Sequence, residues 1–210
     1  MNRKGSIMTD IRIGDLRRED FKRAIDFAIE GMHFKELVGG GPLLRLYGTY
    51  FWYLELLYAT QAIAAYADGR FVGALLASYA GEPRVFKSAP MSAFVAAFGF
   101  VEKAVDPSAR DYYQANDRML SELEAVVKPD GELRFLAAEP GGSVKGVGTA
   151  LLEELARRER GKLTYLYTDS GCTYQFYEKR GFELVGQEEV AVGSGKDRKP
   201  LTCFLFAKVL

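Results

Sequence analysis

Four glycines lie within residues 141–148, and they form the part of this chain best suited to binding a charged ligand. The apolar residues 132–138 before them predict a strand, while Val147, Leu151 and Leu155, spaced four apart, predict one face of a following helix. A helix start exposes unpaired N–H groups and the positive end of the helix dipole. Because glycine lets an anion lie close to the backbone, the sequence predicts a phosphate-binding turn.

Two familiar phosphate-binding loops do not fit this turn. A P-loop needs a Lys-Ser or Lys-Thr pair directly after its last glycine, whereas Gly146 and Gly148 are followed by Val147 and Thr149. A dinucleotide fingerprint needs glycine or alanine at position 151, where this chain has leucine. The turn therefore belongs to another class of phosphate site, in which we expect a side chain at Gly148 to occupy the space of the ligand.

A second strand and helix follow the first pair. Residues 162–168 alternate and are rich in β-forming side chains, which predicts a strand. Asp169 and Ser170 are suitable N-caps for a helix that carries residues 174–180 and ends at Gly181.

Two motifs in this stretch resemble the GCN5-related N-acetyltransferase superfamily. Gly146-x-Gly148 matches the end of its pyrophosphate loop, and Tyr177-Glu-Lys-Arg-Gly-Phe182 matches its Tyr-x-x-x-Gly-Phe signature. Each motif alone is weak, but both occur here in the family's order, with a strand and a helix between them. The resemblance implies a single domain over residues 1–210 with a mixed, strongly bent sheet of about seven strands flanked by helices.

The resemblance further implies direct transfer of an acetyl group from acetyl-CoA to a primary amine in a ternary complex, without a metal. Tyr177 is the expected acid for the departing sulfur, and Glu132 is the expected base for the amine. The residues expected to contact the coenzyme are Leu136, Ala137, Ala138, Ser143, Val144, Lys145, Gly146, Val147, Gly148, Thr149, Ser170 and Tyr174. Small residues after position 136 suit a pantetheine arm that lies along the strand like an added strand.

Two positions depart from the family pattern. Ser143 stands where the family has glutamine or arginine, so Lys145 is the alternative cation, and Ser170 stands where the family has asparagine. These departures leave a second function open, an acyl-CoA-binding sensor without turnover, and a longer acyl donor is a third. Tyr177 could also be a packing residue, and Glu132 a solvated residue with water as the base.

Composition excludes several other classes of function. Twenty-eight basic and 28 acidic side chains cancel, so we expect no nucleic acid and no membrane as partner. The single histidine, His33, leaves little scope for a metal site or a catalytic triad, and Cys172 and Cys203 imply no disulfide framework. We expect a cytoplasmic protein, and the oligomeric state stays open, with a homodimer as one option.

The rest of the chain follows the family's expected order. We predict a strand, two helices, a hairpin with an Asp-Gly turn, a helical insertion and two final strands. Their ranges are 10–14, 17–32, 43–58, 60–67 with 70–79, about 83–130 with helices at 90–105 and 111–127, then 183–192 and 201–209.

Four consecutive aromatic residues, 50–53, stand in the second of these helices, near Tyr47. They cannot all point to one side of a helix. We therefore expect the insertion to close over this helix and form a narrow, aromatic-walled pocket for a small amine acceptor, with cation–π contacts to its charged form.

Overall fold

The computed structural model describes residues 10–32, 34–35, 39–105, 107–192 and 198–210. His33 and most of the polar loop between the last two strands lie outside these residues. None of the helices in the described parts of the chain combines the length and the apolar character that a membrane span requires.

The N-terminal half contains β1 (Ile11–Asp15), the short helix η1 (Arg18–Asp20), α1 (Phe21–Gly31), α3 (Pro42–Tyr58) and the hairpin of β2 (Gln61–Ala67) and β3 (Arg70–Tyr79). The hairpin turn has Asp68 and Gly69 both at positive φ, as the predicted Asp-Gly turn requires. α3 begins with a proline directly after Gly41, because proline needs no hydrogen-bond acceptor for its nitrogen in the first helical turn. The predicted order of elements in this half is confirmed.

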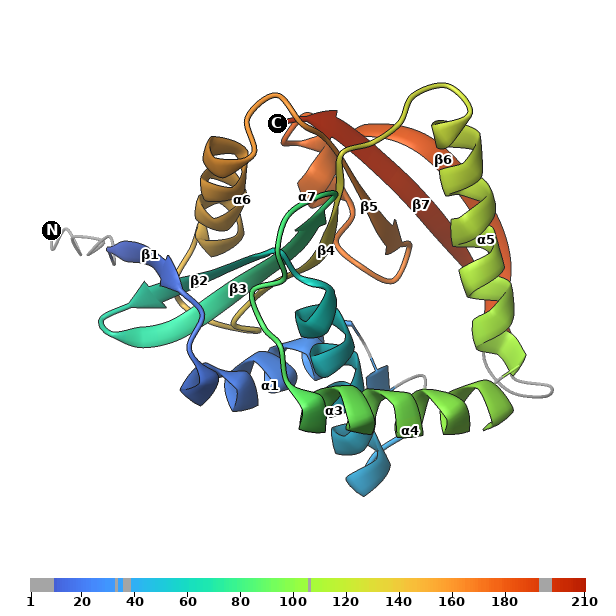
Figure 1. Cartoon of the computed structure of the whole chain (residues 1–210), viewed down its shortest axis with the longest axis horizontal. Coiled ribbons are helices and arrows are strands. Elements are labelled where there is room, and N and C mark those ends of the chain that lie inside the picture. The colour runs from blue at the N-terminus through green and yellow to red at the C-terminus, as the bar shows by residue number, and fades with distance from the viewer. Residues whose placement is uncertain (1–9, 33, 36–38, 106, 193–197) are drawn as a thin grey trace, which may run out of the picture.

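The second half contains β4 (Gly131–Ala138), α6 (Val147–Arg158), β5 (Leu163–Asp169), the short α7 (Gln175–Glu178), β6 (Glu183–Val192) and β7 (Lys199–Val209). Within the described residues the strands form one seven-stranded sheet in the order β1-β2-β3-β4-β5-β7-β6. All neighbours are antiparallel except β4 and β5. Figure 1 shows β7 crossing the direction of β2 and β3, which confirms the mixed, bent sheet.

Alternating side chains of the sheet pack against helices on both faces. Ile63, Leu75 and Leu133 lie in the cluster that α6 covers, whereas Ala64, Leu76 and Phe135 pack against α1 and α3. Leu133 and Phe135 of β4 lie on opposite faces of the sheet although they are two residues apart. The reason is a bulge at Arg134, which places Leu76 opposite Phe135 and Ala77 opposite Leu133.

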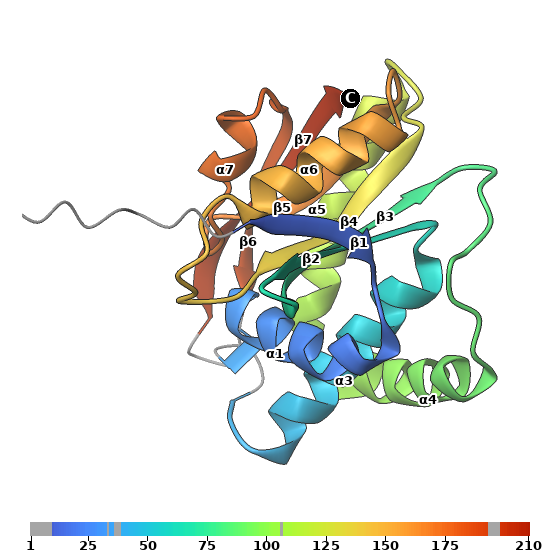
Figure 2. The ribbon, with the colours of Figure 1, turned by 90° about the vertical axis from the view of Figure 1, so that its left-hand side faces the viewer.

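Two further helices, α4 (Ala89–Val105) and α5 (Pro107–Glu124), connect β3 to β4. Both were expected, although α5 begins and ends earlier than predicted, with Pro107 inside its first turn. The two helices diverge: α4 runs across α3, while α5 lies along β6 and β7 (Figures 1 and 2). Met119 of α5 packs on Cys203 and Leu205 of β7, on the sheet face opposite α6.

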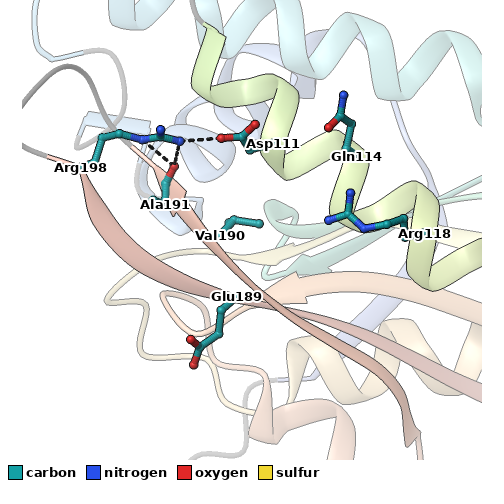
Figure 3. A pocket seen from close by; sticks show the side chains of 7 residues that line it. All are labelled: Asp111, Gln114, Arg118, Glu189, Val190, Ala191 and Arg198. Carbon is teal, nitrogen blue, oxygen red and sulfur yellow. Dashed lines mark hydrogen bonds and ion pairs between the residues drawn. The ribbon is translucent and has the colours of Figure 1, made fainter.

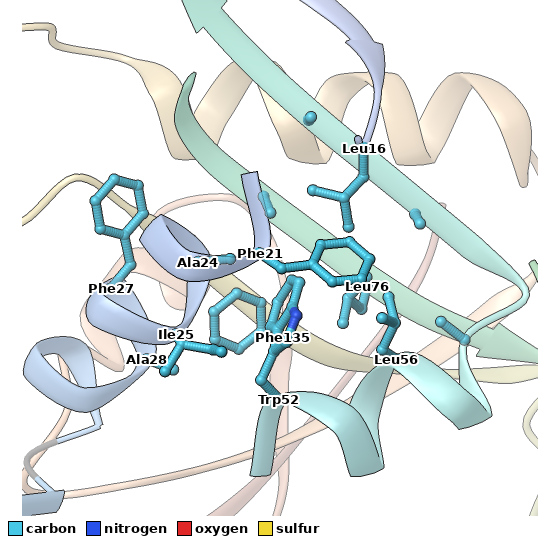
Figure 4. Packing of buried hydrophobic residues seen from close by; sticks show 14 of the residues in the cluster. Leu16, Phe21, Ala24, Ile25, Phe27, Ala28, Trp52, Leu56, Leu76 and Phe135 are labelled. Atoms are coloured by element: carbon cyan, nitrogen blue, oxygen red, sulfur yellow. The ribbon is translucent and has the colours of Figure 1, made fainter. Parts of the chain in front are cut away.

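The consecutive aromatic side chains of α3 divide between two packing surfaces. Trp52 is fully buried, with its ring 5.8 Å from Phe21 and 5.3 Å from Phe135 (Figure 4). Tyr50 and Tyr53 turn to α4 and contact two of its phenylalanines, Phe98 at 4.8 Å and Phe94 at 5.7 Å. The expected contact between α3 and the inserted helices is therefore present as ring packing, and the aromatic-walled pocket for the acceptor stays a prediction.

Candidate functional site

The glycine turn between β4 and α6 forms one wall of a cavity of about 410 Å³. Gly146 has φ of 83° and caps α6, so the backbone turns sharply into the helix. The first helical hydrogen bond runs from the N–H of Ala150 to the carbonyl of Gly146, which leaves the N–H groups before it for a ligand. The predicted strand, turn and helix are therefore present, and the helix start opens into a cavity.

The predicted coenzyme residues of the turn do not all face this cavity. Its lining consists of Ala138, Glu139, Gly141, Gly142, Val144, Lys145, Gly146, Val147, Gly148, Thr149, Phe176 and Arg180. Ser143 is exposed and is not among them. The side chain of Val147 is buried in the core, so this residue offers only its backbone. Lys145 is exposed, with its ammonium 3.4 Å from the carbonyl of Gly142.

Arg180 brings a second cation to the cavity, from the segment after α7. Its guanidinium lies 3.5 Å from the centre of the Phe176 ring and donates to the Phe176 carbonyl at 2.9 Å and to the Thr149 hydroxyl. Its Nε is buried and has no hydrogen-bond partner among the described residues. Arg180 lies within the Tyr-x-x-x-Gly-Phe motif, at a position for which the motif predicts no role. The sequence did contain a signal that a cation must come from elsewhere, because position 143 has serine where the family has glutamine or arginine.

Gly148 has a different role from the one expected. A Cβ at this position would meet the Phe176 ring at 3.0 Å rather than the open part of the cavity. Glycine leaves room here for the Phe176 ring, which lies against the first turn of α6 and on which the guanidinium of Arg180 stacks. The expectation that a side chain at Gly148 would first fill the ligand's space is therefore wrong.

β4 and β5 separate immediately after they meet. They pair only at Gly131 with Thr164 and at Glu132 with Tyr165. Beyond Glu132, no strand of the described residues pairs with the edge of β4 that faces β5, although the other edge pairs with β3 as far as Ala138. Leu136, Ala137 and Ala138 lie along this open edge, whose free N–H and C=O groups can pair with an extended ligand.

The segment after β5 is folded less regularly than predicted. α7 spans only four residues, and Asp169 and Ser170 do not cap it. The Asp169 carboxylate accepts from the N–H of Gly171, and the Ser170 hydroxyl accepts from the N–H of Thr202, because both side chains close the turn beside β7. Tyr174 packs its ring on Phe204, at 4.6 Å.

Tyr177 lies half-buried on the α6 face of the sheet. Its ring packs with Phe176 and Phe182, at 5.2 and 5.8 Å. Burial raises the pKa of the Tyr177 hydroxyl above its ordinary value, and nearby Cys172 adds to the shift. The hydroxyl therefore keeps its proton at neutral pH and is able to donate it.

Glu132 points to the opposite face of the sheet, at the last paired position before the strands separate. Its carboxylate lies 2.6 Å from Nη1 of Arg134 and 3.5 Å from the Tyr165 hydroxyl. Burial raises its pKa, while Arg134 and the Tyr165 hydroxyl act in the other direction. Glu132 is therefore not the solvated residue that the alternative interpretation assumed.

Glu55 of α3 joins this group, and sequence reasoning gave it no role. Its carboxylate lies 2.7 Å from Nε of Arg134. Burial raises the pKa of Glu55 to about 7; Arg134 opposes the shift and Glu132 adds to it. The signal in the sequence was an acidic residue in the middle of an aromatic, apolar helix.

A second cavity, of about 360 Å³, lies between α5 and the ends of β6 and β7 (Figure 3). Its two arginines are already paired: Arg198 lies 2.6 Å from Asp111, and Arg118 donates to Glu188 at 3.0 Å. The charge of each arginine is therefore balanced by a carboxylate within the described residues. Across the described residues, no group of His, Cys, Asp and Glu is arranged to hold a metal ion.

The sequence matches no family model and no curated protein. Solved structures do resemble the fold. A structure described as histone acetyltransferase HPA2 and related acetyltransferase, from Corynebacterium glutamicum, shares 17% identity over 94% of this chain and 96% of that chain, with a TM-score of 0.53. PaiA N-acetyltransferase from Thermoplasma acidophilum, in complex with coenzyme A, shares 16% identity over 96% and 99%, with a TM-score of 0.53. An N-acetyltransferase from Staphylococcus aureus shares 13% identity over 96% and 99%, with a TM-score of 0.51.

At these identities the similarity concerns the fold. The chain has the mixed seven-stranded fold of the GCN5-related N-acetyltransferases, as the two motifs had predicted.

Proposed function

We propose that this chain, which has the fold of the GCN5-related N-acetyltransferases, transfers an acetyl group from acetyl-CoA to a primary amine of a small molecule. One observation carries the proposal: β4 and β5 open between two faces of the sheet that hold different chemistry. The anion-binding turn and Tyr177 lie on the α6 face, and the carboxylates of Glu132 and Glu55 lie on the other. Donor and acceptor can meet through this opening, which favours direct transfer in a ternary complex.

The residues around the turn fit a coenzyme A molecule. The free N–H groups at the start of α6 suit its pyrophosphate, and the guanidinium of Arg180 and the ammonium of Lys145 supply positive charge. The open edge of β4 along Leu136, Ala137 and Ala138 suits the amides of the pantetheine arm. When bound, acetyl-CoA supplies an activated thioester, since a thiolate is a fair leaving group.

The remaining residues have roles that follow from their protonation. Glu132 accepts a proton from the amine at the point where the strands separate. Tyr177, whose hydroxyl stays protonated, donates to the departing sulfur. Ser170 and Tyr174 contribute to the coenzyme site by shaping the turn after β5, because both side chains are engaged with β7.

The test is an activity panel with purified protein. Acetyl-, succinyl- and longer acyl-CoA donors are combined with polyamines, aminoglycosides, amino acids and basic peptides, and the acylated product is measured by mass spectrometry. We expect acetyl-CoA to be consumed with at least one small amine. Turnover of long peptides alone would contradict a small-molecule acceptor.

A sensor that binds acyl-CoA without turnover is the second candidate function. The observation in its favour concerns two side chains that were expected to contact the coenzyme. Ser143 does not line the cavity, and the Ser170 hydroxyl already accepts a hydrogen bond from the N–H of Thr202. Tight binding of acetyl-CoA by calorimetry, with no product from any amine of the panel, would support the sensor and contradict the enzyme.

A further inference from the structure

Arg84 lies in the segment between β3 and α4, which passes beside the end of α3 (Figure 1). Two contacts fix this segment. The N–H of Val85 donates to the carbonyl of Ala59 at 2.9 Å, and the ring of Phe86 packs on Phe21 with a centre distance of 5.5 Å. The backbone directly after Arg84 is therefore anchored to the fold, and the arginine side chain extends from a defined position.

The guanidinium of Arg84 is held in place by an aromatic ring. It stacks on Tyr58, 5.0 Å from the ring centre, and within the described residues it makes no hydrogen bond and no ion pair. Glu82, the acidic residue of the same segment, is already engaged by Lys162 at 2.5 Å and by Gln61 at 3.1 Å. Because stacking fixes the orientation of a guanidinium and leaves its N–H groups exposed, Arg84 is prepared to bind a planar anion.

The same ring connects Arg84 to the proposed base. The guanidinium of Arg134 also lies 5.0 Å from the centre of the Tyr58 ring, and its Nη1 is 2.6 Å from Glu132. The two guanidinium carbons, each 5.0 Å from one point, are at most about 10 Å apart, which is about one Debye length at moderate salt. Glu132 and Arg84 are therefore close enough for one small molecule to contact both.

The two arginines differ in their charge balance. Arg134 is shared by two carboxylates, because its Nε also lies 2.7 Å from Glu55, whereas no carboxylate of the described residues pairs with Arg84. Burial raises the pKa of Glu55 to about 7, so this carboxyl is partly protonated at neutral pH. The four side chains together then carry a positive charge, and Arg84 is the member whose charge is unpaired.

Negative charge gathers beside β5 on the same face of the sheet. Burial raises the pKa values of the Tyr165 and Tyr167 hydroxyls, and the carboxylates of Glu132 and Glu124 raise both further. The face therefore has negative charge beside β5 and an unpaired positive charge at Arg84. Such an arrangement orients a molecule that carries a cation at one end and an anion at the other.

We propose that Arg84 binds a carboxylate of the acceptor, so that the acceptor is an amino carboxylic acid with its primary amine at Glu132 and its carboxylate at the stacked guanidinium. Tyr58 is a positioning residue that holds this guanidinium. The inference rests on the proposed acetyl transfer and specifies its acceptor class. Polyamines, which have no anionic end, are excluded as the preferred acceptors.

The first test needs no acetyl transfer. In ¹⁵N-labelled protein the arginine Nε–H signals are recorded by NMR, and the signal that is absent in Arg84→Ala is assigned to Arg84. Sodium hexanoate should shift this signal in a saturable way, because a carboxylate accepts hydrogen bonds from the guanidinium. Hexylammonium chloride at equal ionic strength is the control for screening and for the alkyl chain, and it should shift nothing. Tyr58→Ala should weaken the hexanoate shift, and Tyr58→Phe, which keeps the ring, should restore it.

The second test compares matched acceptors. β-Alanine, γ-aminobutyrate and ε-aminocaproate are each paired with the alkylamine of equal carbon number, which is propylamine, butylamine or hexylamine. In wild type, at least one amino acid should have the higher kcat/KM of its pair. Arg84→Ala should lower this ratio by roughly five- to thirtyfold, since water partly weakens a hydrogen bond to an exposed charged group. Lys87→Ala removes an exposed cation from the same segment and, as the matched control, should leave the ratio unchanged.

The outcomes separate the two claims. Suppose that amines are acetylated, but hexanoate shifts nothing, or every alkylamine is preferred to its amino acid, or Lys87→Ala lowers the ratio as much as Arg84→Ala. Any of these results refutes this inference and leaves the proposed function standing. If the hexanoate shift is present but no amine is acetylated, the carboxylate site at Arg84 stands and the proposed function is refuted.

Discussion

Arg180 offers the sharpest test of the coenzyme site. Its guanidinium lines the same cavity as the glycine turn, and its buried Nε–H has no hydrogen-bond partner in the described part of the chain. A hydrogen bond from a charged donor is worth about 1.5–3 kcal/mol. Since about 1.4 kcal/mol is a factor of ten in affinity, Arg180→Ala should weaken coenzyme A binding by roughly ten- to a hundredfold.

A series of three ligands identifies the group that Arg180 contacts. Calorimetry is run with coenzyme A, dephospho-coenzyme A and pantetheine, on Arg180→Ala and on the exposed neighbour Lys179→Ala as the matched control. Coenzyme A and dephospho-coenzyme A should lose affinity alike, because both keep the pyrophosphate. Pantetheine, which has none, should be unaffected.

Two results would refute the reasoning about Arg180. An unchanged affinity for coenzyme A would mean that the guanidinium only packs on Phe176. An equal loss with pantetheine would mean that the substitution deforms the open edge of β4 instead of removing a phosphate contact. Thermal melts of Arg180→Ala accompany the series, because the arginine also donates to the Thr149 hydroxyl and the Phe176 carbonyl.

Three further predictions concern the core and the two sheet faces. Tyr177→Phe should lower kcat by on the order of ten- to a thousandfold with little change in coenzyme affinity, and unaltered turnover would make Tyr177 a packing residue. Glu55→Gln should remove a pH dependence of the free energy of unfolding. In wild type, the raised pKa of Glu55 stabilises the fold at low pH, and this contribution falls by about 3 kcal/mol between pH 4.5 and 7. Urea unfolding of wild type and variant at pH 5 and pH 8 measures the difference, and parallel curves would contradict it. Trp52→Ala should cost about 3–5 kcal/mol in the same assay, because the side chain is fully buried, whereas the half-exposed Tyr58→Ala should cost much less.

The sequence by itself determined the local features of this protein. Apolar spacing predicted the strand of β4 and the helix of α6, and the glycines between them predicted the sharp turn that joins the two. Asp68 and Gly69 specified the hairpin turn for the same reason, because these residues tolerate backbone angles that others avoid. Local patterns of this kind are decided by neighbouring residues, so they can be read from the chain.

The tertiary structure alone decided which charges meet. Glu55 was visible only as an interruption in an apolar helix, and its partnership with Arg134 depends on where α3 packs on the sheet. The bulge at Arg134 is equally hidden, since it arises from the pairing of β4 with β3 and turns the guanidinium and the neighbouring Phe135 to the α3 face. Arg180 reaches Thr149 over 31 positions of sequence. The reason is physical: the backbone angles of a segment follow from its own residues, whereas the electrostatics of a site follow from the approach of segments that have no sequence pattern in common.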